Sequence, residues 1–193
     1  YKRQAMAGSG LPYRWKPDAP SRIGVLPFDA PGDAVQWCEL DPCFVFHPLN
    51  SFDRADGTIQ LDVAKHQSMF NTVTNGPSEG PPEMYRWILD PAKGTVTEEL
   101  LDDRNQEFPR VDERMIGKDA RYGYTVGFVG EEGPAFKRDL HTNEVELHDF
   151  GKRCDLPAFV ADLDRGGTGF LGRRGPGGCA RGGEFRESSS DPR

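Results

Sequence analysis

Two segments of the chain, 49 residues apart, repeat one pattern and restrict the fold more than any other feature. Residues 87–96 and 136–145 match in an aromatic residue, an aspartate, a glycine or asparagine, and a valine. Each copy predicts two strands joined by a tight turn. A period of about 50 residues is typical of a β-propeller, whose blades are four-stranded sheets. The repeat therefore predicts the outer hairpin of a blade, with a β-sandwich as the alternative.

Short apolar runs separated by turn residues continue through residues 1–163, without convincing helical periodicity. Residues 58–63 alternate apolar and polar side chains, and Asp56-Gly57 before them suits a tight hairpin turn that pairs this strand with residues 43–47. At about 50 residues a blade, the body supplies about three blades, fewer than a closed propeller needs. We expect an all-β, partial β-propeller and a chain that is part of a larger protein.

The segment 164–193 differs sharply in composition from residues 1–163. It is rich in glycine, arginine and serine, and almost no apolar residues recur in it at regular spacing. Such a segment has little to bury. We predict that residues 164–193 are disordered, or the product of out-of-frame translation, and that the folded unit is confined to residues 1–163.

Charge and cysteine content exclude several classes of protein. The formal net charge is −7, and the acidic body argues against nucleic acid as a partner. No apolar run approaches the roughly 18 residues of a membrane span, and the first residues lack a secretory signal, so a cytoplasmic protein is expected. The four cysteines form no Cys-x-x-Cys pair, which disfavours both a disulfide framework and a zinc finger.

His47 is the candidate functional residue. It follows the apolar run 43–46, which predicts a buried strand, and Pro48 to Asp53 contain the turn residues that would end this strand at His47. A histidine in such surroundings needs a partner, either a hydrogen-bonding group or a metal ion. From the local sequence alone, Glu107 is expected to be a surface carboxylate just before a strand. The remaining histidines, His66, His141 and His148, are expected to be solvent-facing or turn residues.

Four blocks of sequence, in order, resemble one family. They are residues 12–24, 44–53, 107–114 and 148–151. Over about residues 12–160 the chain resembles the carotenoid cleavage oxygenases, in particular the bacterial apocarotenoid and lignostilbene-type branch. The resemblance implies a seven-bladed β-propeller with a non-haem Fe(II) on its axis, held by four histidines from different blades.

The resemblance also implies roles for single residues. His47 corresponds to the third iron-binding histidine, and Glu107 to a glutamate that accepts the distal N–H of such a histidine. Their order in the chain pairs Glu107 with His47. The other three histidines of this chain do not match iron ligands. Leu156 stands where the family usually has another glutamate.

The implied activity is oxidative cleavage of a conjugated C=C bond by Fe(II) and O2, which turns a carotenoid, apocarotenoid or stilbene into two carbonyl products. The partners are then a lipophilic small molecule and O2, with peripheral membrane contact possible in the full-length parent. With one histidine of four, this chain alone is expected to be inactive. The alternative is a non-catalytic propeller fragment that binds or scaffolds, or a degenerate reading frame. Substrate, cleaved bond and oligomeric state are left open.

Overall fold

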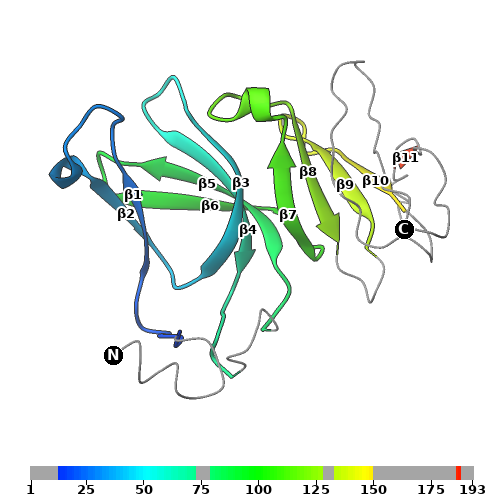
Figure 1. Cartoon of the computed structure of the whole chain (residues 1–193), viewed down its shortest axis with the longest axis horizontal. Helices are drawn as coiled ribbons and strands as arrows, with labels where there is room; N and C mark the ends of the chain where they lie inside the picture. Colours follow the sequence, from blue (N-terminus) through cyan, green and yellow to red (C-terminus); the bar gives the residue numbers. More distant parts are fainter. Residues whose placement is uncertain (1–12, 73–78, 128–132, 150–185, 188–193) are drawn as a thin grey trace.

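The computed structural model describes residues 13–72, 79–127, 133–149 and 186–187, and the regular structure in them is almost entirely β-strand (Figure 1). The exceptions are two single 3-10 turns, η1 (Gly32–Ala34) and η2 (Glu113–Met115). Within these residues, no helix is long and apolar enough to cross a membrane. The predicted all-β class is confirmed.

The described strands form two sheets. The first, in the order β1-β2-β6-β5-β4-β3, consists of β1 (Ser21–Val25), β2 (Gln36–Leu40), β3 (Phe44–Asp53), β4 (Ile59–His66), β5 (Glu83–Asp90) and β6 (Thr95–Asp102). The second, in the order β11-β10-β9-β8-β7, consists of β7 (Gln106–Val111), β8 (Tyr122–Gly127), β9 (Ala135–Asp139), β10 (Val145–His148) and β11 (Arg186–Glu187).

Each sheet contains one antiparallel meander of four consecutive strands, β3–β6 and β7–β10. A four-strand meander is the unit of a propeller blade. The β1–β2 hairpin joins the first meander through a parallel pairing of Glu39 with Thr95. The described residues thus hold two meanders and a hairpin, and the count of about three blades stays a prediction.

The sequence repeat corresponds to the last two strands of each meander. The β5–β6 and β9–β10 hairpins occupy equivalent places, and their turns share one geometry. Gly94 and Asn143 have φ angles of 70° and 63°. Their N–H groups donate to the carbonyls of Asp90 and Asp139, each at 2.8 Å. The prediction of two similar hairpins is confirmed, because glycine and asparagine are the residues that adopt positive φ most readily.

The predicted hairpin between β3 and β4 is present, but its first strand is longer than expected. Gly57 has a φ angle of 83°, as the turn requires. The prediction that the strand ends at His47 is wrong: β3 continues to Asp53, with irregular register between Val45 and Pro48 and again between Pro48 and Asn50. Proline lacks the N–H of a regular ladder and is tolerated here because β3 is the edge strand and is bulged.

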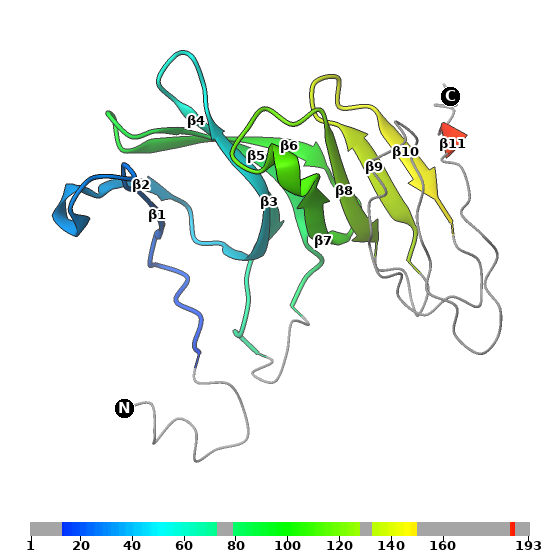
Figure 2. The same ribbon diagram turned by 45° about the horizontal axis from the view of Figure 1, so that its top comes forward.

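The two sheets meet where β3 and β4 approach β7 (Figure 2). The core between them consists of Leu49, Ala64, Met84, Leu101, Val111, Ala120 and Leu140. A Cβ atom on Gly123 of β8 would lie 2.8 Å from Cδ2 of Leu49, so glycine permits this close approach. Asn50 of β3 donates to the carbonyls of Met115 and Lys118 and fastens the η2 segment to the first sheet.

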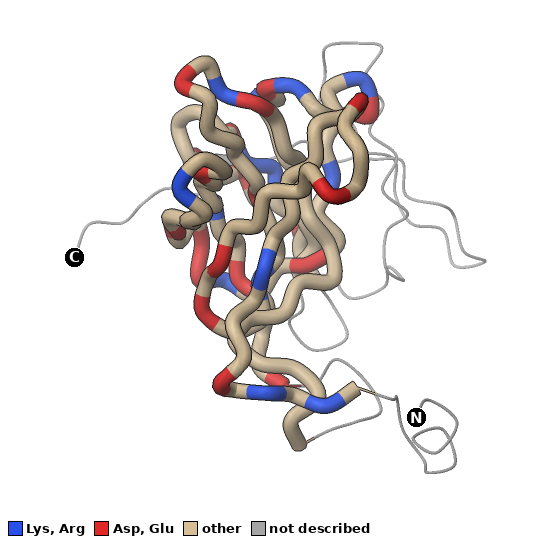
Figure 3. Tube along the Cα trace, turned by 90° about the vertical axis from the view of Figure 1, so that its left-hand side faces the viewer, with Lys and Arg blue, Asp and Glu red and all other residues tan. Residues whose placement is uncertain are grey.

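A second apolar cluster lies on the other face of the first sheet, because Val63 and Ala64 point to opposite sides of β4. Basic and acidic residues are interspersed along the described part of the trace (Figure 3). Of the segment 164–193, the structure describes Arg186 and Glu187, which pair with β10. The rest of that segment, and Leu156, lie outside the described residues.

Candidate metal centre

His47 and Glu107 stand on the first strands of the two meanders. Both strands are irregular at this point, since the register of β7 shifts between Glu107 and Arg110 just as that of β3 shifts around Pro48. Phe108, next to Glu107, has a φ angle of 52°, which is rare for a bulky residue. Bulges of this kind redirect side chains. At these two irregular points, His47 and Glu107 come into contact although they are distant in the chain.

The two side chains form a hydrogen bond across the junction of the sheets. Nδ1 of His47 lies 2.9 Å from Oε2 of Glu107. The Glu107 side chain is 8% exposed and that of His47 is 48% exposed. An ionised carboxylate only accepts hydrogen bonds, so Nδ1 is the donor, and in the neutral form of the ring Nε2 then carries the lone pair. A neutral imidazole held in this way has the form that ligates a metal.

Glu107 is ionised despite its burial. Burial alone raises the pKa of this carboxyl, but interactions with His66, with the N–H of Phe108 and with His47 outweigh it, and the pKa lies below its usual range. The ionised carboxylate can therefore accept hydrogen bonds from several neighbouring donors.

His66 is placed differently from the sequence prediction. It was expected to be a solvent-facing or turn residue, but it ends β4 inside the sheet, opposite Phe44, with a side chain only 4% exposed. Its Nε2 lies 3.7 Å from Oε1 of Glu107. Strand β4 is covered by neighbours along its second half, which keeps water from this ring. Glu107 thus has a histidine on each side.

Aromatic side chains surround the pair. The Phe108 ring centroid lies 5.3 Å from that of His47, and the Phe46 ring meets the His66 ring edge-on at 5.4 Å. Phe44 and Phe70 extend the group. The expectation that residues 43–46 form a buried strand is wrong, because Phe44 is only half-buried and Phe46 is 37% exposed. These rings give the site an open apolar border.

The remaining histidines lie on the β9–β10 hairpin of the second sheet. His141 is in the turn, as predicted, with Nε2 2.9 Å from a carboxylate oxygen of Asp119, whereas His148 ends β10 and is half-buried. Within the described residues, no group of three or more histidine, cysteine, aspartate or glutamate side chains could hold a metal ion. His47 with Glu107 behind it fits one corner of a metal site whose other ligands would come from elsewhere.

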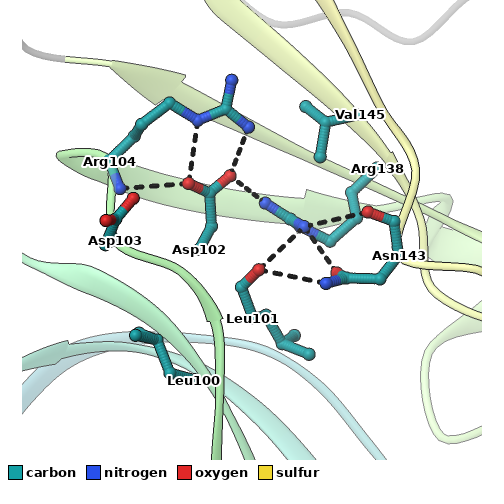
Figure 4. A pocket seen from close by; sticks show the side chains of 8 residues that line it. All are labelled: Leu100, Leu101, Asp102, Asp103, Arg104, Arg138, Asn143 and Val145. Atoms are coloured by element: carbon teal, nitrogen blue, oxygen red, sulfur yellow. Dashed lines mark hydrogen bonds and ion pairs between the residues drawn. The ribbon is translucent and has the colours of Figure 1, made fainter. Parts of the chain in front are cut away.

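A second cluster of buried charges lies between β6 and β9 and borders an open pocket of about 410 Å³ (Figure 4). Asp102 is bonded to Arg104 and Arg138, and Arg138 also donates to Asn143 and to the carbonyl of Leu101. Burial alone raises the pKa of Asp102, but its hydrogen bonds with Arg104 and the charge of Arg138 outweigh this and lower it to about 2. Each oxygen of the carboxylate has a guanidinium partner and the buried Arg138 has further acceptors, as expected for a structural cluster.

Sequence reasoning placed His47 and Glu107 together but missed His66 and the backbone of Phe108. A possible signal for His66 was its position at the end of a strand that had to pair with the aromatic run 44–46. The positive φ of Phe108 had no signal beyond the following Pro109, because phenylalanine itself disfavours that conformation.

Comparison with known proteins gives consistent matches. The sequence model of the family described as RPE65, retinal pigment epithelial membrane protein, matches residues 2–171. A carotenoid cleavage oxygenase from Mycobacterium tuberculosis is 40% identical over 124 residues, which are 62% of this chain and 25% of that protein. Apocarotenoid-15,15'-oxygenase from Synechocystis is 31% identical over 169 residues, which are 80% of this chain and 34% of that protein.

A solved structure shares the arrangement of the strands. Cobalt-substituted apocarotenoid oxygenase from Synechocystis superposes with a TM-score of 0.61 and 28% identity, over 76% of this chain and 34% of that one. The chain therefore spans about a quarter to a third of the length of these relatives.

Proposed function

This chain belongs to the carotenoid cleavage oxygenase family, which includes RPE65, and we propose that it supplies one iron-binding corner of an enzyme that cleaves a conjugated C=C bond oxidatively. In this reaction O2 cleaves the C=C bond of an alkene, and two carbonyl compounds form. The substrate class we propose is that of carotenoids, apocarotenoids or stilbenes.

The observation that carries the proposal is the hydrogen bond between His47 and Glu107. It joins the first strands of two neighbouring meanders and fixes the hydrogen of the imidazole on Nδ1. Nε2 is then the atom available to a metal. Fe(II) suits neutral imidazole ligands, and bound iron would supply the redox chemistry with O2.

The protein's own part is to orient the imidazole and to receive the alkene. Glu107 keeps the His47 ring in one tautomer and one orientation. The rings of Phe46 and Phe108, 37% and 45% exposed, offer apolar faces beside it. Such faces suit a conjugated hydrocarbon chain or an aryl alkene, because stacking and apolar burial favour both.

The chain by itself is expected to hold iron weakly and to lack turnover, since its described residues provide one imidazole corner. Stoichiometric iron in the purified chain, together with cleavage of an apocarotenal, would contradict this expectation.

The function is tested in a chimera in which residues 13–149 replace the matching third of the Synechocystis apocarotenoid oxygenase. We expect about one iron per chain and conversion of an apocarotenal to two carbonyl products. His47→Gln should reduce iron content about tenfold or more and abolish cleavage. His141→Gln, on the exposed turn, is the matched control and should change neither. A His47→Gln chimera that keeps iron and activity would overturn the proposal and favour a non-catalytic binding module.

A further inference from the structure

We propose that His66 is a positioning residue that holds the second oxygen of Glu107. Nε2 of His66 and Oε1 of Glu107 lie 3.7 Å apart, in side chains that are 4% and 8% exposed. Among the described residues, neither atom has a hydrogen-bond partner. Two buried polar atoms of complementary chemistry therefore face each other.

The chemistry of Glu107 requires a donor at this position. Its Oε2 accepts from His47 and from the N–H of Phe108, whereas Oε1 faces the His66 ring. A buried carboxylate oxygen left without a donor destabilises the folded chain, because it has lost its hydrogen bonds to water. A hydrogen on Nε2 of His66 meets this need. The separation is slightly longer than a hydrogen bond, so a small rotation of either side chain closes it.

The surroundings of His66 keep its ring in place. Its Nδ1 lies 3.4 Å from the carbonyl oxygen of Gly80, a second acceptor that competes with Glu107 for the single hydrogen of a neutral ring. The charged carboxylate is the stronger acceptor of the two. The Phe46 ring packs edge-on against the His66 ring at 85°. The backbone is fixed opposite Phe44 by the β3–β4 ladder. The ring is thus confined between a carbonyl, an aromatic edge and the Glu107 carboxylate.

The consequence is that His66 acts on His47 through Glu107. A carboxylate held at one oxygen can turn about its last bond, whereas one held at both cannot, so the contact keeps Oε2 aligned with Nδ1 of His47. The functional meaning of this contact rests on the proposed iron-binding role of His47. The contact itself is a property of this chain and is measured without metal.

The first test locates the hydrogens on the four histidines of the 15N-histidine-labelled chain by long-range 1H–15N NMR, at about pH 8, where a free imidazole is neutral. The inference requires hydrogen on Nε2 of His66. A His66 ring with hydrogen on Nδ1 alone would overturn it, because a bare nitrogen would then face the carboxylate.

The second test compares two variants by the same spectrum, with the His47 signals as readout. His66→Phe keeps a ring against Phe46 but removes the donor, and we expect His47 to lose its Nδ1–H form in favour of mixed tautomers. His66→Gln restores an N–H near Nε2 and should keep that form. Unchanged His47 signals in His66→Phe would contradict the inference, with unchanged His141 signals as the check on folding.

The two proposals fail separately. If His66 donates to Glu107 but His47→Gln leaves iron in the chimera, the proposed function falls and the positioning contact stands. If the His66→Phe variant does not fold, the hydrogen on Nε2 in the unmodified chain still decides the question.

Discussion

Two buried clusters of charge connect the sheets, and they are built in opposite ways. Around Asp102 the carboxylate lies between two guanidinium groups, and Arg138 is also bonded to Asn143 and to Leu101. Around Glu107 the partners are two imidazoles, one of them 48% exposed, and one carboxylate oxygen has no hydrogen bond from the described residues. The first cluster is complete within this chain. The second binds a half-exposed imidazole through Nδ1 alone, so Nε2 is not used by the carboxylate and suits a ligand.

The largest effect is expected at the complete cluster. Asp102→Asn removes the negative charge between Arg104 and Arg138, both of which then lose their ion-pair partner. Breaking a buried ion pair costs about 3–5 kcal/mol. Chemical denaturation should show this loss in the free energy of unfolding. Asp103→Asn, at an exposed neighbour, is the control and should change stability by less than about 0.5 kcal/mol.

The same carboxylate should make the chain sensitive to acid. Because its pKa is lowered from 3.8 to about 2 in the folded state, its contribution is complete above pH 3.8 and is lost as the pH falls towards 2. The expected loss is about 2 kcal/mol, which urea denaturation at pH 5, 4, 3 and 2 would measure. Asp102→Asn should lack this component of the pH dependence. An equal acid loss in that variant would assign it to other carboxylates.

Asn143 offers a smaller test of the complete cluster. Asn143→Gly suits the positive φ of the turn, as Gly94 does in the equivalent hairpin, but it removes the side chain that binds Arg138 and the Leu101 carbonyl. We expect a net loss of about 1–2 kcal/mol in unfolding free energy. An unchanged or increased free energy of unfolding would mean that the gain from glycine in the turn outweighs the loss of these hydrogen bonds.

The smallest effect is expected beside the incomplete cluster. Phe108 holds a φ angle of 52° with a ring that is 45% exposed, so Phe108→Gly relieves the backbone while losing little packing. We expect Phe108→Gly to exceed the matched Phe108→Ala by about 1 kcal/mol in unfolding free energy, because alanine retains the Cβ atom. Equal stabilities would show that the backbone at this bulge is unstrained.

The comparison also explains what could be predicted from the sequence. The two hairpins of the repeat were predicted correctly because glycine and asparagine mark positive φ locally. His47 was predicted as the end of a buried strand, yet β3 runs on past Pro48 with its rings partly exposed, since a bulged edge strand tolerates proline. The burial of His66 depends on strand pairing and on β7, some 40 residues later, and no local pattern encodes such packing.

The central claim is that Glu107 fixes His47 with its hydrogen on Nδ1 and leaves Nε2 for a metal. The 15N NMR signals of His47 at about pH 8, in the unmodified chain and in Glu107→Gln, test it most directly. We expect one tautomer, with hydrogen on Nδ1, in the unmodified chain and a mixture in Glu107→Gln. Hydrogen on Nε2 in the unmodified chain, or the same tautomer in both, would contradict the account.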